Sequence, residues 1–189
     1  MAKRRATLRN DNSTGDAAMD KIHFSSLLEM REMNKRFSSL VYNTDQLSTV
    51  LVLHMVCEKI LEKWIEASSN NKEFFNNSVS LTFNNKLNIA NNFSLPIACF
   101  RFMKALNSIR NKFAHDIHKT EVSNTEIDML YSSLHEFINR NPGEDPKHLK
   151  LITTNGTYTF NDNNNIKLMI MFTAAYLSAL EFAGLWAPS

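Results

Sequence analysis

Glycine, proline and cysteine are all scarce in this chain of 189 residues. Its four glycines and four prolines are too few to punctuate the many tight turns of a β-rich fold. The two cysteines, Cys57 and Cys99, lie in apolar stretches, and no secretory hydrophobic segment precedes them. We therefore expect free, buried thiols in a reducing compartment, the cytoplasm, rather than a domain stabilised by disulfides.

Charge of one sign is also scarce, because 21 Lys and Arg residues oppose 19 Asp and Glu residues. A net charge of +2 provides no strong field for nucleic acid or an anionic membrane, so any basic site must be local. The apolar stretch from Leu168 to Leu180 is uncharged over 13 residues, fewer than the roughly 20 that span a bilayer. No membrane association is expected.

Apolar residues recur at spacings of three and four, which is typical of helices and favours an all-α fold. We expect one domain over residues 19–189, a bundle of about five to six helices, preceded by a flexible basic arm over residues 1–18. The first predicted helix is His23–Leu40, and the second is 46–68, capped by Thr44 or Asp45. A short helix is expected within 81–93, followed by one over 96–115 with Pro96 as its first residue. The last two predicted helices are 126–140, capped by Asn124 or Thr125, and 166–186.

Three local patterns add detail to this bundle. Asn155–Gly156, between β-branched and aromatic residues, predicts a small β-hairpin near residues 150–160. In the short helix, Lys86 is expected to point away from the apolar face. His54 lies in an apolar helix, so we interpret it as a hydrogen-bonded core histidine rather than a ligand.

The helix that begins at Pro96 carries an unusual polar row. Lys104, Asn107, Asn111 and His115 are spaced by three, four and four residues, so they share one exposed side, with Arg110 at its border. Solvated helix surfaces are usually rich in Glu and Lys, whereas this row has amides, one arginine and one histidine. Arg110 and His115 are separated by about 7.5 Å of helical rise, so their long side chains can converge on one small anion if the helix ends or bends near His115.

An arginine and a histidine together suit metal-independent cleavage of RNA. The histidine exchanges protons near neutral pH, the arginine stabilises the charge that develops on the phosphate, and Asn111 can position the substrate or the imidazole. A purely structural polar helix end remains the alternative. His115 and His118 have the spacing of two metal ligands, but no cysteine or carboxylate completes a site, so neither a metal nor another cofactor is expected.

The segment IRNKFAHD resembles the signature of the HEPN superfamily, in which an arginine followed by a polar residue precedes a histidine on a long helix of an all-α bundle. Arg110, Asn111 and His115 match it one by one. Many members are metal-independent endoribonucleases of toxin–antitoxin and phage-defence systems that act as dimers. The resemblance implies that Arg110 and His115 are the catalytic pair, with Asn111 assisting.

The order of LTFNNKL, a helix and LNSIRNKFAHD is also similar to the mannitol operon repressor family, over about residues 81–116. That similarity implies a non-catalytic transcriptional regulator or partner-binding module. Three functions therefore stay open. The first is a homodimeric, cytoplasmic ribonuclease acting on tRNA or mRNA, and the second is a silent regulator. The third is a toxin with the same chemistry whose activity is masked by an antitoxin or other regulatory protein. Substrate-binding candidates beside the catalytic pair are Lys104, Asn107, Lys112 and His118.

Overall fold

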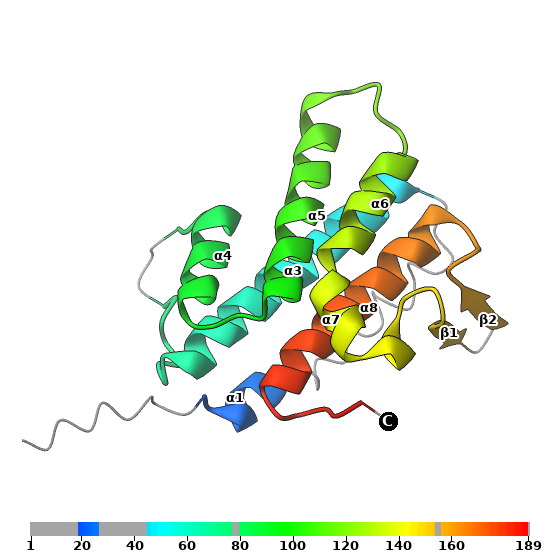
Figure 1. Cartoon of the computed structure of the whole chain (residues 1–189). Coiled ribbons are helices and arrows are strands. Elements are labelled where there is room, and N and C mark those ends of the chain that lie inside the picture. Colours follow the sequence, from blue (N-terminus) through cyan, green and yellow to red (C-terminus); the bar gives the residue numbers. More distant parts are fainter. Residues whose placement is uncertain (1–18, 27–44, 77–79, 154–155, 189) are drawn as a thin grey trace, which may run out of the picture.

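The helices of the computed structural model confirm the all-α prediction; the structure describes residues 19–26, 45–76, 80–153 and 156–188. Seven α-helices, a 3-10 helix and a two-stranded sheet lie in these ranges (Figure 1). They are α1 (Lys21–Ser25), α3 (Gln46–Ser68), α4 (Phe83–Asn92), α5 (Ile97–His115), α6 (Asn124–Ser133), α7 (His135–Arg140), η1 (Pro142–Glu144), β1 (Lys150–Thr153), β2 (Gly156–Thr159) and α8 (Asn164–Phe182).

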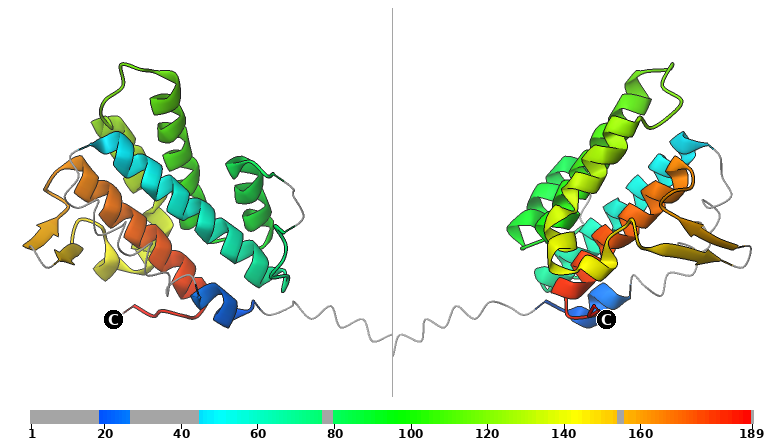
Figure 2. Two further views of the ribbon diagram at one scale, coloured as in Figure 1. Left: turned by 180° about the vertical axis from the view of Figure 1, so that it is seen from behind. Right: turned by 45° about the vertical axis from the view of Figure 1, so that its right-hand side comes forward.

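The central helix of the bundle is α3. Asp45 caps it, because its carboxylate accepts hydrogen bonds from the backbone N–H groups of Leu47 and Ser48. The helices α1, α4, α5 and α8 all contact α3, and Figure 2 shows α8 running beside it in the same direction. The central helix is therefore covered on several sides.

The C-terminal end of α5 is held in place by the connection to α6. Figure 1 shows α5 and α6 as an antiparallel pair joined by residues 116–123. In that connection the backbone N–H of Val122 donates to Oε1 of Gln46 at the start of α3, at 2.6 Å, and its carbonyl accepts from Nδ2 of Asn164 at the start of α8, at 2.9 Å. The end of α5 is thereby tied to the first turns of two other helices.

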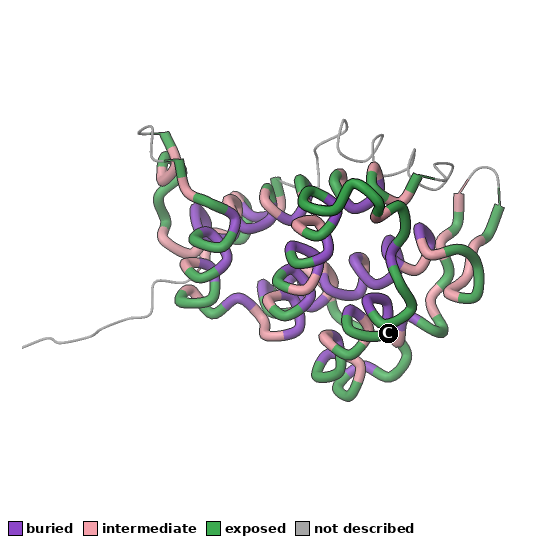
Figure 3. The backbone as a smooth tube through the Cα atoms, turned by 90° about the horizontal axis from the view of Figure 1, so that it is seen from above, coloured by how far each residue is buried: buried purple, intermediate pink, exposed green. Residues whose placement is uncertain are grey.

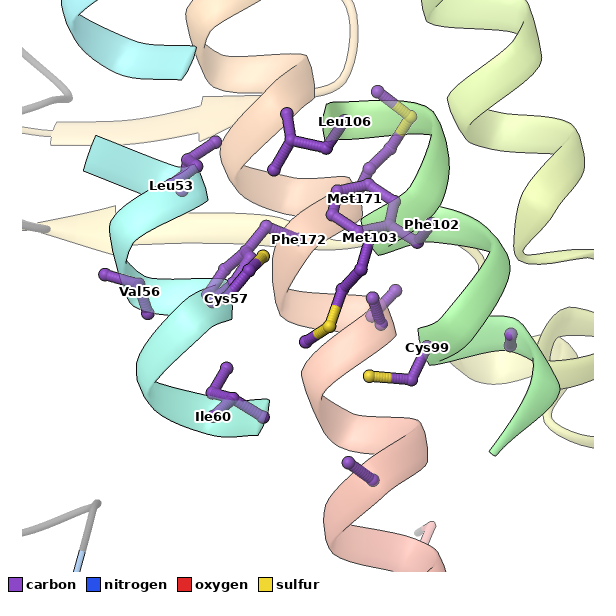
Figure 4. Close-up of a cluster of buried hydrophobic side chains, with 14 of the residues drawn as sticks. Leu53, Val56, Cys57, Ile60, Cys99, Phe102, Met103, Leu106, Met171 and Phe172 are labelled. Carbon is purple, nitrogen blue, oxygen red and sulfur yellow. The ribbon is translucent and has the colours of Figure 1, made fainter. Parts of the chain in front are cut away.

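The core lies where α3, α5 and α8 meet. Figure 4 shows Leu53 and Cys57 of α3, Phe102 and Leu106 of α5, and Phe172 of α8 packed together. The buried segments follow the inner sides of the helices, while exposed residues gather in the loops and outer turns (Figure 3). Both cysteines are free and fully buried, as the apolar stretches predict.

The predicted β-hairpin is confirmed near the start of α8. Strands β1 and β2 pair antiparallel, with Lys150 opposite Thr159 and Thr153 opposite Gly156. Asn163 then caps α8, because its side-chain oxygen accepts from the backbone N–H of Ile166 at 3.1 Å. The helix contacts both strands, so the hairpin extends the bundle at this end.

The N-caps of two helices differ from the predictions. Pro96 is the N-cap of α5 rather than its first residue, because its ψ of 135° is extended. The cap of α6 is Ser123, not Asn124 or Thr125, because Ser123 forms a reciprocal capping box with Glu126.

The helix predicted over residues 126–140 is also interrupted. Leu134, which is fully buried, has a ψ of −1° and donates its N–H to the carbonyl of Tyr131, three residues back. The backbone turns there and divides the segment into α6 and α7.

The prediction for Lys86 is wrong, because this side chain is buried between α4 and α3. Its Nζ lies 2.7 Å from Oε1 of Glu58 and 2.6 Å from Oε1 of Glu62. The carboxylates of α3 face α4, so the lysine points into the helix interface with its charge paired.

Several predictions lie wholly or partly outside the described residues. These are the basic arm over residues 1–18, most of the helix expected over His23–Leu40, the cap at Thr44, and Asn155 of the hairpin connection. Within the described ranges, no helix combines the length and the apolar character that crossing a membrane requires.

Candidate functional site

The polar row predicted on α5 runs up to the end of that helix. The helix stops at His115 because Asp116 is extended, with φ −125° and ψ 102°, and its carboxylate accepts from the backbone N–H of His118 at 2.9 Å. Lys112 and His115 lie in the last turn, where the partial negative charge of a helix C-terminus favours cations.

Two adjoining depressions lie along this row. We call the first the His115 depression; it has a volume of about 440 Å³ and is lined by Asn84 of α4 and by Lys104, Asn107, Ser108, Asn111, Lys112 and His115 of α5. We call the second the Arg110 depression, and its volume is about 330 Å³. Its lining residues come from three segments: His54 and Glu58 of α3, residues 81–84 at the start of α4, and Asn107, Arg110 and Asn111 of α5. Three amides, Asn84, Asn107 and Asn111, line both.

Within one chain, Arg110 and His115 line different depressions. Five residues along an α-helix turn the side-chain direction by about 140°, so the two side chains leave α5 on different sides. Arg110 donates from Nη1 to Oδ1 of Asn111 at 3.3 Å, so these two residues of the motif are in contact. The ring of His115 is exposed and makes no hydrogen bond to any residue in the described ranges.

The expectation that the whole polar row on α5 is exposed is wrong for Asn107, which is only 8% exposed. Its Oδ1 lies 2.9 Å from Nε2 of His54, and its Nδ2 donates to Oδ1 of Asn84 at 3.0 Å. One amide therefore links α3, α4 and α5 beneath the floor shared by the two depressions.

His54 is fixed by this link and by an aromatic contact. Because the amide nitrogen of Asn107 donates to Asn84, its oxygen accepts, and Nε2 of His54 carries the proton. The imidazole also lies 4.2 Å from the ring of Phe83, centroid to centroid, at 30°. The expected hydrogen bond of His54 is confirmed, but the residue lines a surface depression beside Arg110.

The surroundings of His54 favour its neutral form. Burial lowers the pKa of the imidazole most, the hydrogen bond with Asn107 opposes this, and the nearby charge of Arg110 lowers the pKa further. The carboxylate of Glu58 raises it, but that carboxylate is itself paired with Lys86. The Arg110 depression thus holds a cation beside a neutral imidazole.

The other predicted substrate-binding residues differ in their positions. Lys104 and Lys112 line the His115 depression, with Lys104 Nζ 6.0 Å from the ring of Phe100 and Lys112 paired with Glu126 at 3.0 Å. His118 follows the end of α5, is exposed, and lines neither depression.

Sequence reasoning missed Asn84 and Glu58, and it assigned His54 to the core alone. The sequence did contain an indication that His54 belongs to a site. His54, Glu58 and Glu62 are spaced four residues apart, so they form a polar stripe along an otherwise apolar helix. Nothing local could indicate Asn84, because its bond to Asn107 joins residues 23 positions apart.

No family model, curated protein or solved structure matches the chain. Among the described residues, no group of three or more His, Cys, Asp or Glu side chains could hold a metal ion. The geometry of the two depressions therefore carries the functional argument.

Proposed function

We propose that the chain is a metal-independent endoribonuclease of the HEPN type, a toxin or phage-defence effector, with Arg110 and His115 as its reactive pair. The observation that carries this proposal is that the exposed His115 and the half-buried Arg110 and Asn111 line two adjoining depressions that share three amides. A row of this kind offers a cation, an imidazole and several hydrogen-bonding amides to one extended polar ligand.

The chemistry follows from these groups. A guanidinium binds two phosphate oxygens at once and remains charged, so Arg110 holds the scissile phosphate and stabilises the charge that builds up on it. An imidazole gives and takes protons near neutral pH, so His115 serves proton transfer during the cleavage. Asn111, in contact with Arg110, orients the guanidinium.

A second copy of the chain completes the cleft in this proposal. Arg110 and His115 of one chain line separate depressions, and a two-fold axis beside α5 would bring His115 of one copy to the Arg110 depression of the other. Leu51 and Met55, on either side of His54 along α3, are 39% and 52% exposed and provide apolar surface for this association.

One observation favours the second candidate, a non-catalytic regulator that binds a protein or nucleic acid. No described residue fixes the ring of His115, whereas catalytic imidazoles are commonly oriented by a hydrogen-bonded partner. In that function the accessible row on α5 would be a recognition surface.

Incubation of the purified protein with total RNA and with tRNA in EDTA distinguishes these functions. We expect cleavage by the wild type and none by Arg110→Ala or His115→Ala, since each variant removes an accessible group without opening the core. His135→Ala, an exposed histidine on α7, is the matched control and should retain full activity. Intact RNA with the wild type would instead support the regulator, as would variants that cleave normally.

A further inference from the structure

Within one chain, the imidazole that shares a depression with Arg110 is that of His54 on α3, not that of His115 in the sequence motif. Both side chains line the Arg110 depression, and the charge of Arg110 acts on the imidazole directly. Cleavage of RNA through its 2′-hydroxyl uses two proton transfers, one from the attacking oxygen and one to the leaving oxygen. The motif supplies one histidine for two tasks.

The surroundings of His54 suit the first of these transfers, removal of the proton from the attacking oxygen. Its Nε2–H is committed to Asn107, so Nδ1 is the nitrogen with a lone pair, and no residue in the described ranges hydrogen-bonds to it. Asn107 and the ring of Phe83 fix the imidazole from two directions. A general base needs this combination of a defined tautomer, a fixed ring and a neighbouring phosphate site.

The charged groups around His54 agree with this role. Glu58 lies one turn further along α3 and is paired with Lys86 of α4, while α5 contributes Arg110. Burial and Arg110 keep the pKa of His54 below the ordinary imidazole range, so the ring accepts a proton at neutral pH. His115 lies exposed in the last turn of α5 and lines the other depression.

We propose that His54 is a further catalytic residue, the general base that activates the 2′-hydroxyl of an RNA nucleotide whose 3′-phosphate is bound by Arg110. Nδ1 of His54 takes the hydroxyl proton as O2′ bonds to phosphorus. The bond from phosphorus to O5′ breaks, and O5′ leaves with a proton from His115. The products are a 2′,3′-cyclic phosphate and a 5′-hydroxyl end, and water returns both imidazoles to their starting states.

This assignment rests on the proposed ribonuclease function, and single-turnover cleavage of a short RNA from about pH 5 to pH 8 tests it. His54→Gln retains an N–H donor for Asn107 but cannot accept the proton. We expect its rate near pH 7 to fall by at least about 100-fold, and the decline of rate towards acid pH to disappear. His135→Gln is the matched control and should show the wild-type profile.

A binding measurement separates this role from a structural one. The affinity for an oligonucleotide with a 2′-deoxy nucleotide at the cleavage position should change less than about threefold in His54→Gln, because general-base catalysis does not require His54 for ground-state binding. His54→Asn, with thermal unfolding measured beside it, replaces His54→Gln if that variant is unfolded.

The possible results of these experiments distinguish a failure of the role proposed for His54 from a failure of the proposed ribonuclease function. A folded His54→Gln variant that cleaves with the wild-type rate and pH profile would overturn the role of His54 and leave the ribonuclease intact. A loss of affinity that accounts for the whole loss of rate would do the same. A wild type that cleaves no RNA at any pH would overturn the proposed function and this assignment together.

Discussion

At the scale of single residues, the two histidines near Arg110 differ in how they are held. His54 is fixed by Asn107 and Phe83, whereas His115 stands exposed at the end of its helix. A fixed ring suits a step that needs one defined proton acceptor, and an exposed ring suits exchange with solvent. The hydrogen-bond partners of the two rings therefore distinguish their proposed roles better than their positions in the sequence do.

Glu126 is the carboxylate that secures the connection after His115, and its protonation should weaken the fold. Burial alone would raise its pKa, but hydrogen bonds from Lys119, the backbone N–H of Ser123 and Lys112 outweigh this and lower the pKa from 4.5 to about 2. Because the pKa of Glu126 is lower in the folded state, the ionised carboxylate stabilises the fold at pH values above its unfolded pKa. This stabilisation is lost as the pH falls from 4.5 towards 2.

Replacing this carboxylate should make stability less sensitive to acid. We expect Glu126→Gln to reduce the free energy of unfolding at pH 7 by about 1–3 kcal/mol, since hydrogen bonds to charged partners are lost. Urea denaturation at several pH values measures this, with the exposed Glu121→Gln as control. Equal acid sensitivity in Glu126→Gln and the wild type would contradict the assignment.

At the scale of helices and strands, the sequence predicts what depends on neighbours along the chain. Asp45 as an N-cap, α5 ending at His115 and the hairpin before α8 all follow from local patterns. Lys86 could not be placed, because its ion pairs join residues 24 and 28 positions apart. The same holds for His54 and Asn84, whose place in the site depends on how α3, α4 and α5 pack.

Because α3 and α5 pack together, we expect the cysteines on these two helices to be unreactive towards thiol reagents. Cys57 and Cys99 are fully buried, and burial raises the pKa of both thiols, that of Cys99 to about 12. Because the thiolate is the reactive form, neither should react with a thiol reagent until the helices separate. Labelling with and without denaturant checks this, and an exposed cysteine introduced by Ser132→Cys should react at once. Rapid labelling of the native wild type would mean that the contact opens.

At the scale of the whole molecule, the position of the site depends on distant parts of the chain. Val122 joins the connection after α5 to Gln46 and Asn164, so the starts of α3 and α8 fix where His115 lies. Arg110 is placed by the middle of α5, which packs on the core. Arg110 and His115 are close in sequence, but within one chain they line different depressions, so the proposed active site needs a second chain.

Mixing two inactive variants tests this arrangement directly. If Arg110 of one chain works with His115 of the other, a dimer of Arg110→Ala with His115→Ala has one site with both groups intact and one with neither. Random exchange at equal amounts puts about half of the dimers in this mixed form, so cleavage should recover to about a quarter of the wild-type rate. Mixing either variant with His135→Ala is the control for dilution, because it should give about half of the wild-type rate whether or not the chains exchange. No recovery, although mass measurements show that mixed dimers form, would mean that each active centre takes Arg110 and His115 from the same chain.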